Sequence, residues 1–191
     1  WQIVNAGIGN YNAKRTISNY FSNLEDFNWD TIVYGYFVND AEKLAWNNGN
    51  FITRNFMVGV LAWKFWATIN NEWESLEEYY KAIYDPRNEG FLEMKKSMQR
   101  LAKHCKEKSI RCVIAMIPDI HQTQPYKLGF IHDAIQAIAD ENEMEFLDLL
   151  PVLEPYQAEQ LWNEYNDPHP NAIAHEIMGQ NIYDHLSLKD R

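Results

Sequence analysis

Residues Arg111–Ile117 read RCVIAMI, and Pro118 closes this apolar run. Such a run, ended by a residue that cannot donate to a β-ladder, is typical of a strand buried on both faces of a parallel sheet. Helical patterns flank it at residues 91–108 and at about 130–141. Because short apolar runs that alternate with helical patterns are typical of parallel sheets covered by helices, the sequence predicts an α/β fold.

The same alternation extends in both directions and predicts the remaining elements. Strands are expected at residues 2–6, 31–38 and 145–149, and helices at about 12–21 and 172–186, the last with Asn171 as its N-cap. Residues 151–162 are expected to form a loop and one helix. The chain contains no linker, repeat or low-complexity segment, so we expect one domain over residues 1–191.

The middle of the chain carries its most apolar stretch, residues 56–69, with Lys64 inside it. It is too short to span a bilayer, so we predict a buried core helix, with an interfacial helix as the alternative and no firm membrane association. Ser75 and Glu78 have the spacing of a capping box. The aromatic region 49–84 is where we expect substrate specificity to lie.

Charge and cysteine content narrow the function further. The 27 acidic and 17 basic residues give a net charge of −10, which argues against a general nucleic-acid binder and leaves neutral or weakly polar substrates. Cys105 and Cys112 are too few for a disulfide framework and match no zinc motif, so we expect buried, inert thiols.

Polar residues follow the predicted strands, at the edge where parallel sheets bind ligands. They are residues 7–12, Asn39 and Asp40, Asp119 and His121, and residues 166–171 before the last helix. His121, His132, His175 and His185 are expected to have surface or structural roles, with contact to substrate as the alternative for His121 in its loop. The histidines do not suggest a metal site.

His169 is the strongest catalytic candidate. Pro168 and Pro170 stiffen its backbone, and the Asp167 carboxylate is close enough in sequence to fix the imidazole tautomer and raise its basicity. These are the requirements of a general base for a hydroxyl nucleophile. The alternative is a rigid loop that leads into the last helix.

Three segments resemble, in order, conserved blocks of the SGNH (GDSL-type) hydrolase superfamily. Residues 5–12 (NAGIGNYN) resemble the second block, residues 36–40 (YFVND) the third, and residues 167–171 (DPHPN) the fifth. The resemblance implies a three-layer, flavodoxin-like SGNH-hydrolase fold with a central parallel sheet flanked by helices. It also implies a Ser-His-Asp ester hydrolase or acyl transferase that needs no cofactor or metal.

The resemblance assigns roles to individual residues. His169 would be the base, Asp167 its orienting carboxylate, and Asn39 a side-chain donor to the oxyanion, with a backbone N–H of Gly9 or Asn10 as the second donor. Many members place the acid three positions before the histidine, where this chain has Asn166. The alternative for Asn39 is that it only ties down its loop.

The first block of the family, which carries the nucleophilic serine in a Gly-Asp-Ser turn, has no counterpart in this chain. We therefore expect an N-terminal segment of the same protein upstream of Trp1 that supplies it. Three functions stay open: an esterase acting on a small or carbohydrate ester, an O-acetyltransferase that uses the same residues, and a non-catalytic SGNH-like binding module. The sequence does not decide the compartment.

Overall fold

The computed structural model describes residues 2–43, 75–165 and 167–188, and its centre is a parallel sheet. The strands β1 (Thr31–Phe37), β2 (Arg111–Ile117) and β3 (Glu145–Asp148) lie in the order β1-β2-β3, with Tyr34 opposite Ile114 and Ile114 opposite Phe146. The α/β class and these three predicted strands are confirmed. The run RCVIAMI is the central strand, because it is the one whose backbone pairs on both sides.

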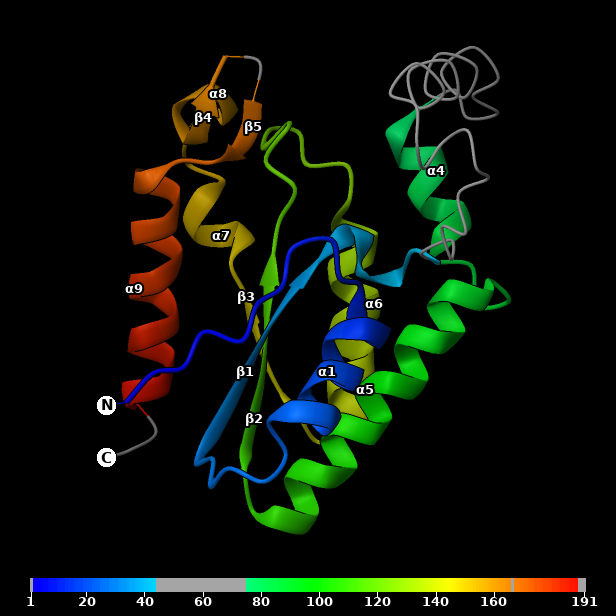
Figure 1. The fold of residues 1–191 in the computed structure, drawn as a ribbon. Coiled ribbons are helices and arrows are strands. Elements are labelled where there is room, and N and C mark those ends of the chain that lie inside the picture. Colours follow the sequence, from blue (N-terminus) through cyan, green and yellow to red (C-terminus); the bar gives the residue numbers. More distant parts are fainter. Residues whose placement is uncertain (1, 44–74, 166, 189–191) are drawn as a thin grey trace, which may run out of the picture.

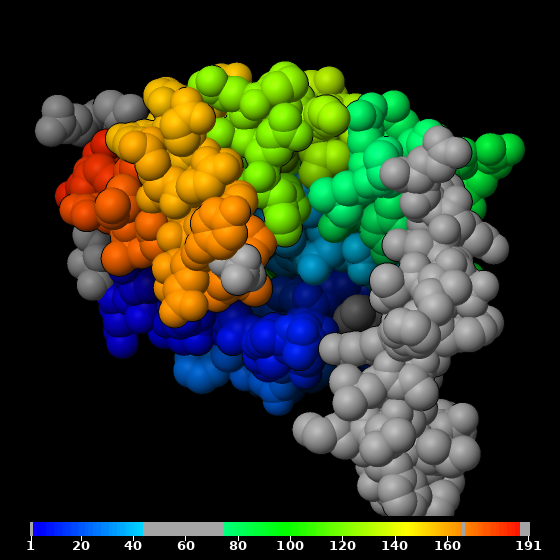
Figure 2. All heavy atoms as spheres, turned by 90° about the horizontal axis from the view of Figure 1, so that it is seen from above, coloured from blue at the N-terminus to red at the C-terminus, as the bar shows by residue number. Residues whose placement is uncertain are grey.

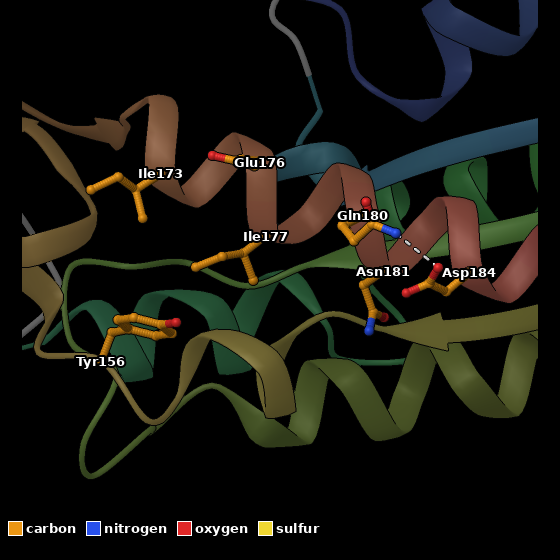
Figure 3. Close-up of a pocket in the computed structure, with 7 residues that line it drawn as sticks. All are labelled: Tyr156, Ile173, Glu176, Ile177, Gln180, Asn181 and Asp184. Carbon is orange, nitrogen blue, oxygen red and sulfur yellow. Dashed lines mark hydrogen bonds between the residues drawn. The ribbon is translucent and has the colours of Figure 1, made fainter.

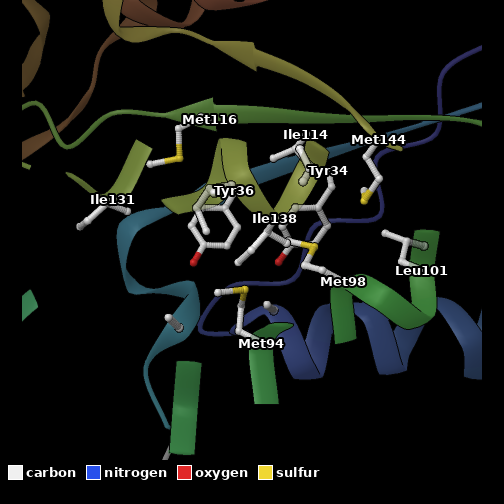
Figure 4. Packing of buried hydrophobic residues seen from close by; sticks show 14 of the residues in the cluster. Tyr34, Tyr36, Met94, Met98, Leu101, Ile114, Met116, Ile131, Ile138 and Met144 are labelled. Atoms are coloured by element: carbon white, nitrogen blue, oxygen red, sulfur yellow. The ribbon is translucent and has the colours of Figure 1, made fainter. Parts of the chain in front are cut away.

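One face of the sheet is covered by α1 (Ala13–Asn23), α5 (Glu89–Lys108) and α6 (Gly129–Glu141) (Figure 1). The side chains packed there include Tyr34 and Tyr36 from β1, Met94 and Met98 from α5, and Ile131 from α6 (Figure 4). Every second residue of β1 and every third or fourth residue of α5 points into this cluster. The helices predicted near these positions are therefore confirmed.

The opposite face is covered by α9 (Ala172–Leu188) together with the short helices α7 (Leu150–Leu153) and α8 (Ala158–Leu161). Asn171 begins α9 as predicted, since its Oδ1 accepts the N–H of Ala174 at 3.0 Å. Residues 151–162 thus contain two short helices where one was expected. Glu145 holds the far end of α9 against the sheet through His185 at 3.0 Å.

A small hairpin of β4 (Trp162–Glu164) and β5 (Asp167–Pro170) lies above the carboxyl edge of the sheet. The rigid loop that was the alternative interpretation of this segment is therefore a short strand at 167–170. Pro168 and Pro170 are compatible with a strand here because β5 pairs on one side only, so a missing N–H can face away from its partner.

The strand predicted at residues 2–6 is also wrong. These residues are exposed, with Ile3 85% accessible, and they pair with no strand of the described chain. A β-type pattern forms a strand only beside a partner, and the outer edge of β1 is itself unpaired in the part of the chain that the structure describes, with Val33 38% exposed.

The remaining described elements are η1 and α4. The 3₁₀ helix η1 (Val38–Ala41) follows β1. The helix α4 (Leu76–Ile83) has Ser75 as its N-cap, whose hydroxyl accepts the N–H of Glu78 at 3.2 Å as predicted. Both cysteines are buried and carry free thiols, not a disulfide, as predicted. The apolar helix expected at 56–69 and most of the aromatic region 49–84 lie outside the described residues.

Candidate functional site

The carboxyl ends of the strands lead into one surface. β1 continues into η1 with Asn39, and β2 continues into the loop with Asp119 and His121. The indole N–H of Trp162 in β4 donates to the carbonyl of Ile120 at 2.7 Å, which ties the hairpin to this loop. Figure 2 shows a hollow above η1 that is bordered by the hairpin, by the loop after β2 and by α4.

Asp167 and His169 form the predicted pair. Asp167 Oδ1 accepts the His169 backbone N–H at 3.3 Å and also contacts the ring Nδ1, while its Oδ2 accepts from Asn163 at 3.0 Å. The bond from His169, followed by that from Asn163, lowers the pKa of Asp167 to about 2, so the carboxylate is ionised at neutral pH. Because an ionised carboxylate only accepts, Nδ1 carries the proton and Nε2 is left as the basic nitrogen.

The surroundings of this pair are open. The His169 side chain is 86% exposed and that of Asp167 39%. Within the described residues, Nε2 of His169 has no hydrogen-bond partner. In the described part of the chain this nitrogen can therefore receive a proton from a hydroxyl group, as a general base must.

A second Asp-x-His pair lies on the loop after β2. Asp119 Oδ1 contacts Nδ1 of His121 at 2.6 Å and accepts the His121 backbone N–H at 2.9 Å, the same pattern as in the first pair. Asp119 is only 5% exposed, whereas the His121 side chain is 59% exposed. Asp119 and His121 were predicted to lie at this edge, and His121 was expected to have a surface or structural role, with contact to substrate as the alternative. The signal that could have revealed the pair is the repeated Asp-x-His spacing at 119–121 and 167–169.

A buried network holds Asp119 in place. The backbone N–H of Asp119 donates to the hydroxyl of Tyr126 at 3.2 Å, and that hydroxyl is hydrogen-bonded to Nε2 of His132 at 2.9 Å. Nδ1 of His132 in turn contacts Asp148 at the end of β3 at 2.9 Å. Side chains from α6 and β3 thus fix the loop from below, and the structural role expected for His132 agrees with this position.

η1 is clamped from beneath and leaves Asn39 exposed on top. Asp40, 6% exposed, accepts the Tyr34 hydroxyl and the Phe37 backbone N–H, each at 3.1 Å. Burial raises the pKa of Asp40 to about 7, although both hydrogen bonds oppose the shift. Tyr84 also donates to the carbonyl of Val38 at 2.9 Å, so the backbone that presents Asn39 is held at both ends.

α4 borders the same hollow, and its tyrosines lie close to Glu42. Burial raises the pKa of Glu42, and hydrogen bonds from Tyr79 and Tyr80 partly offset this. Burial also raises the pKa of Tyr80, with the charges of Glu42 and Asp119 as the next causes. Glu42 next to η1, the hydroxyls of α4 and the Asp119 carboxylate are therefore neighbours.

Gly9 and Asn10 form an exposed turn before α1, with Asn10 in the left-handed region at φ 62°. Asn12, the N-cap of α1, donates its side-chain amide to the carbonyl of Glu42 at 2.7 Å, which brings the turn to the η1 end of the sheet. The structure thus joins Asp167 to His169 directly. It places Asn39, Gly9 and Asn10 at the same edge. In the described chain none of these three residues is hydrogen-bonded to His169 or His121.

Other features of the described residues are less informative. They contain no cluster of three or more His, Cys, Asp or Glu side chains suited to a metal ion, and no helix with the length and apolarity to cross a membrane. A cavity of about 400 Å³ runs along α9, where Tyr156, Ile173 and Ile177 lie at one end and Gln180, Asn181 and Asp184 at the other (Figure 3). None of the predicted site residues lines it.

Comparison with known proteins gives no independent assignment: no protein-family model, curated protein or solved structure matches this chain.

Proposed function

We propose that this chain is an SGNH-type, flavodoxin-like serine hydrolase domain that removes an acyl or acetyl group from a small or carbohydrate ester. The observation that carries the proposal is the Asp167–His169 pair, in which an ionised carboxylate holds Nδ1 and, among the residues that the structure describes, Nε2 has no partner. Its place beside the carboxyl edge of a parallel sheet, where ligands bind in such folds, adds support.

The proposed reaction begins when a serine hydroxyl attacks the ester carbonyl. His169 Nε2 takes the hydroxyl proton and Asp167 stabilises the resulting imidazolium. The side-chain amide of Asn39 and a backbone N–H of Gly9 or Asn10 donate to the oxyanion of the tetrahedral intermediate. Collapse of the intermediate gives an acyl-enzyme, which water then hydrolyses, without a metal or cofactor.

The proposed reaction needs a serine nucleophile within reach of Nε2 of His169. Two of the described serines have structural roles: Ser75 caps α4, and the Ser97 hydroxyl donates to the carbonyl of Glu93 at 2.8 Å.

Two alternatives keep the same site. An O-acetyltransferase would pass the acyl group to a sugar hydroxyl in place of water. A non-catalytic SGNH-like binding module would bind its ligand at the same edge without turnover; the hydrogen bonds of the described residues include none between a serine hydroxyl and His169.

Replacing His169 by Gln tests the base. In the native protein, His169→Gln should lower kcat/KM for short-chain aryl acetates by about 10³-fold, because no other group at this position takes the nucleophile's proton. His175→Gln, on the exposed surface of α9, is the matched control and should retain wild-type kcat/KM. Unchanged hydrolysis by the His169 variant would remove the proposal. An intact protein that hydrolyses no ester and transfers no acetyl group would leave the binding module.

Asn39→Ala tests the oxyanion donor. The amide acts mainly on charge that develops in the transition state, so kcat should fall by about 10²-fold while KM changes little. The measurement is steady-state hydrolysis of the same aryl acetates. A rise in KM with unchanged kcat would instead assign Asn39 to substrate binding or to the loop.

A further inference from the structure

We propose that Asp119 and His121 form a second acid–base pair of the same site, which serves the alcohol oxygen of the ester while His169 serves the nucleophile. This inference rests on the proposed ester chemistry and deepens it. It assigns a substrate class, namely esters of alkyl alcohols such as sugar hydroxyls, because only these need a proton on the leaving oxygen.

The geometry of the second pair is that of an acid–base group. Asp119 holds Nδ1 of His121 at 2.6 Å, and within the described residues Nε2 of His121 has no partner. The carboxylate of Asp119 is buried, whereas the ring of His121 is mostly exposed. The ring is therefore held by a buried group and remains accessible to a ligand. A histidine that merely capped its turn would need only the backbone bond to Asp119, which is also present at 2.9 Å.

The two pairs lie beside the same hollow. The Trp162–Ile120 hydrogen bond of 2.7 Å joins the β4–β5 hairpin, which carries His169, to the residue directly before His121 (Figure 2). On the other side of the Asp119 loop, α4 contributes Tyr80, whose hydroxyl is close enough to feel the charges of Glu42 and Asp119. The loop that carries His121 therefore lies between the hairpin that carries the proposed base and α4, beside the same hollow.

The proton balance uses both histidines in each half-reaction. In acylation, neutral His169 takes the proton of the attacking hydroxyl as the new C–O bond forms, and protonated His121 gives its proton to the alcohol oxygen as the ester C–O bond breaks. In deacylation, neutral His121 takes the proton of the incoming water or hydroxyl. The bond between the acyl carbon and the nucleophile then breaks, and His169 returns its proton to the nucleophile.

The experiment compares two leaving groups in the native protein. A nitrophenolate leaves without protonation, whereas the alkoxide of an acetylated sugar requires an acid. His121→Gln should therefore lower kcat/KM for the sugar acetate by about 10²-fold and that for the nitrophenyl acetate less than about threefold. His169→Gln should lower both to a similar extent, and His175→Gln neither. Circular dichroism checks that each variant folds.

Ring-nitrogen NMR of the histidines gives a readout that does not depend on turnover. Neutral His121 should carry its proton on Nδ1, and Asp119→Asn should change the Nδ1 signal while leaving that of His175 unchanged. A neutral His121 with its proton on Nε2 would overturn the pair. If His121→Gln lowers both esters equally, or neither, while His169→Gln inactivates, this inference fails and the proposed function stands. Full activity of His169→Gln on both esters, or no activity of the wild type on either, overturns both.

Discussion

The two Asp-x-His pairs share their local geometry, but their carboxylates lie in different surroundings. In each pair one carboxylate oxygen contacts both the backbone N–H and Nδ1 of the histidine two residues later. Asp119 is 5% exposed and is anchored by Tyr126, whereas the Asp167 side chain is 39% exposed on a two-stranded hairpin. Sequence spacing thus sets the contact, and the fold decides how firmly the contact is held.

This difference has a chemical consequence. Attraction between an imidazolium and a carboxylate in water is weak, and it strengthens when both are removed from solvent. The His169 side chain is 86% exposed, so Asp167 stabilises its charged form less than a covered carboxylate would. A bound substrate that covers the pair would strengthen this attraction. The Asp119–His121 pair already has its carboxylate buried.

The largest effect on the free energy of unfolding is expected from Asp40. Because its ionisation makes this free energy depend on pH, Asp40 should be replaced before the stabilities of the two pairs are compared. Its pKa is about 7 in the folded protein against 3.8 ordinarily, so ionisation is costlier when folded. The stability that Asp40 contributes is fully present below pH 3.8 and is lost as pH rises through 7. The loss amounts to about 4 kcal/mol if the shift is fully expressed. Asp40→Asn should remove this pH dependence, measured by urea unfolding from pH 4 to pH 8.

The asparagine oxygen can still accept from Tyr34 and Phe37, so the variant should keep the fold of η1. Asp133→Asn, at an exposed position of α6, is the control and should leave the slope of unfolding free energy against pH unchanged. Equal slopes for wild type and Asp40→Asn would show that Asp40 ionises in the folded protein at little cost.

How far the sequence predicted these regions follows from the range of the interactions. The strand at 111–117 and the caps at Asn171 and Ser75 depend on neighbouring residues, and all three were predicted. The Asp167–His169 contact is also local. The Asp119–His121 contact is equally local, and its repeated Asp-x-His spacing could have revealed it. The spacing does not predict the burial of Asp119, which depends on side chains from α6 and β3. Residues 2–6 have a strand pattern without a strand, because pairing requires a partner that the pattern does not contain.

The smallest expected effect is also the most direct comparison of the two carboxylates. Asp119→Ala should lower the free energy of unfolding by about 1–3 kcal/mol, because it removes a buried acceptor and leaves the His121 N–H without its partner. Asp167→Ala should cause no measurable change in the free energy of unfolding, because His169 and Asn163 can form hydrogen bonds to water instead. Urea unfolding at pH 7 measures both, preferably in the Asp40→Asn background.

Asp133→Ala is the control for loss of an exposed carboxylate, and its free energy of unfolding should equal that of Asp167→Ala. Equal losses for Asp119→Ala and Asp167→Ala would mean that burial does not distinguish the pairs, and the greater rigidity assigned to His121 would have no basis. A loss confined to Asp119→Ala would show that the two similar contacts differ in support. A histidine on the firmer support keeps Nε2 in place without substrate, whereas His169 depends on what covers it.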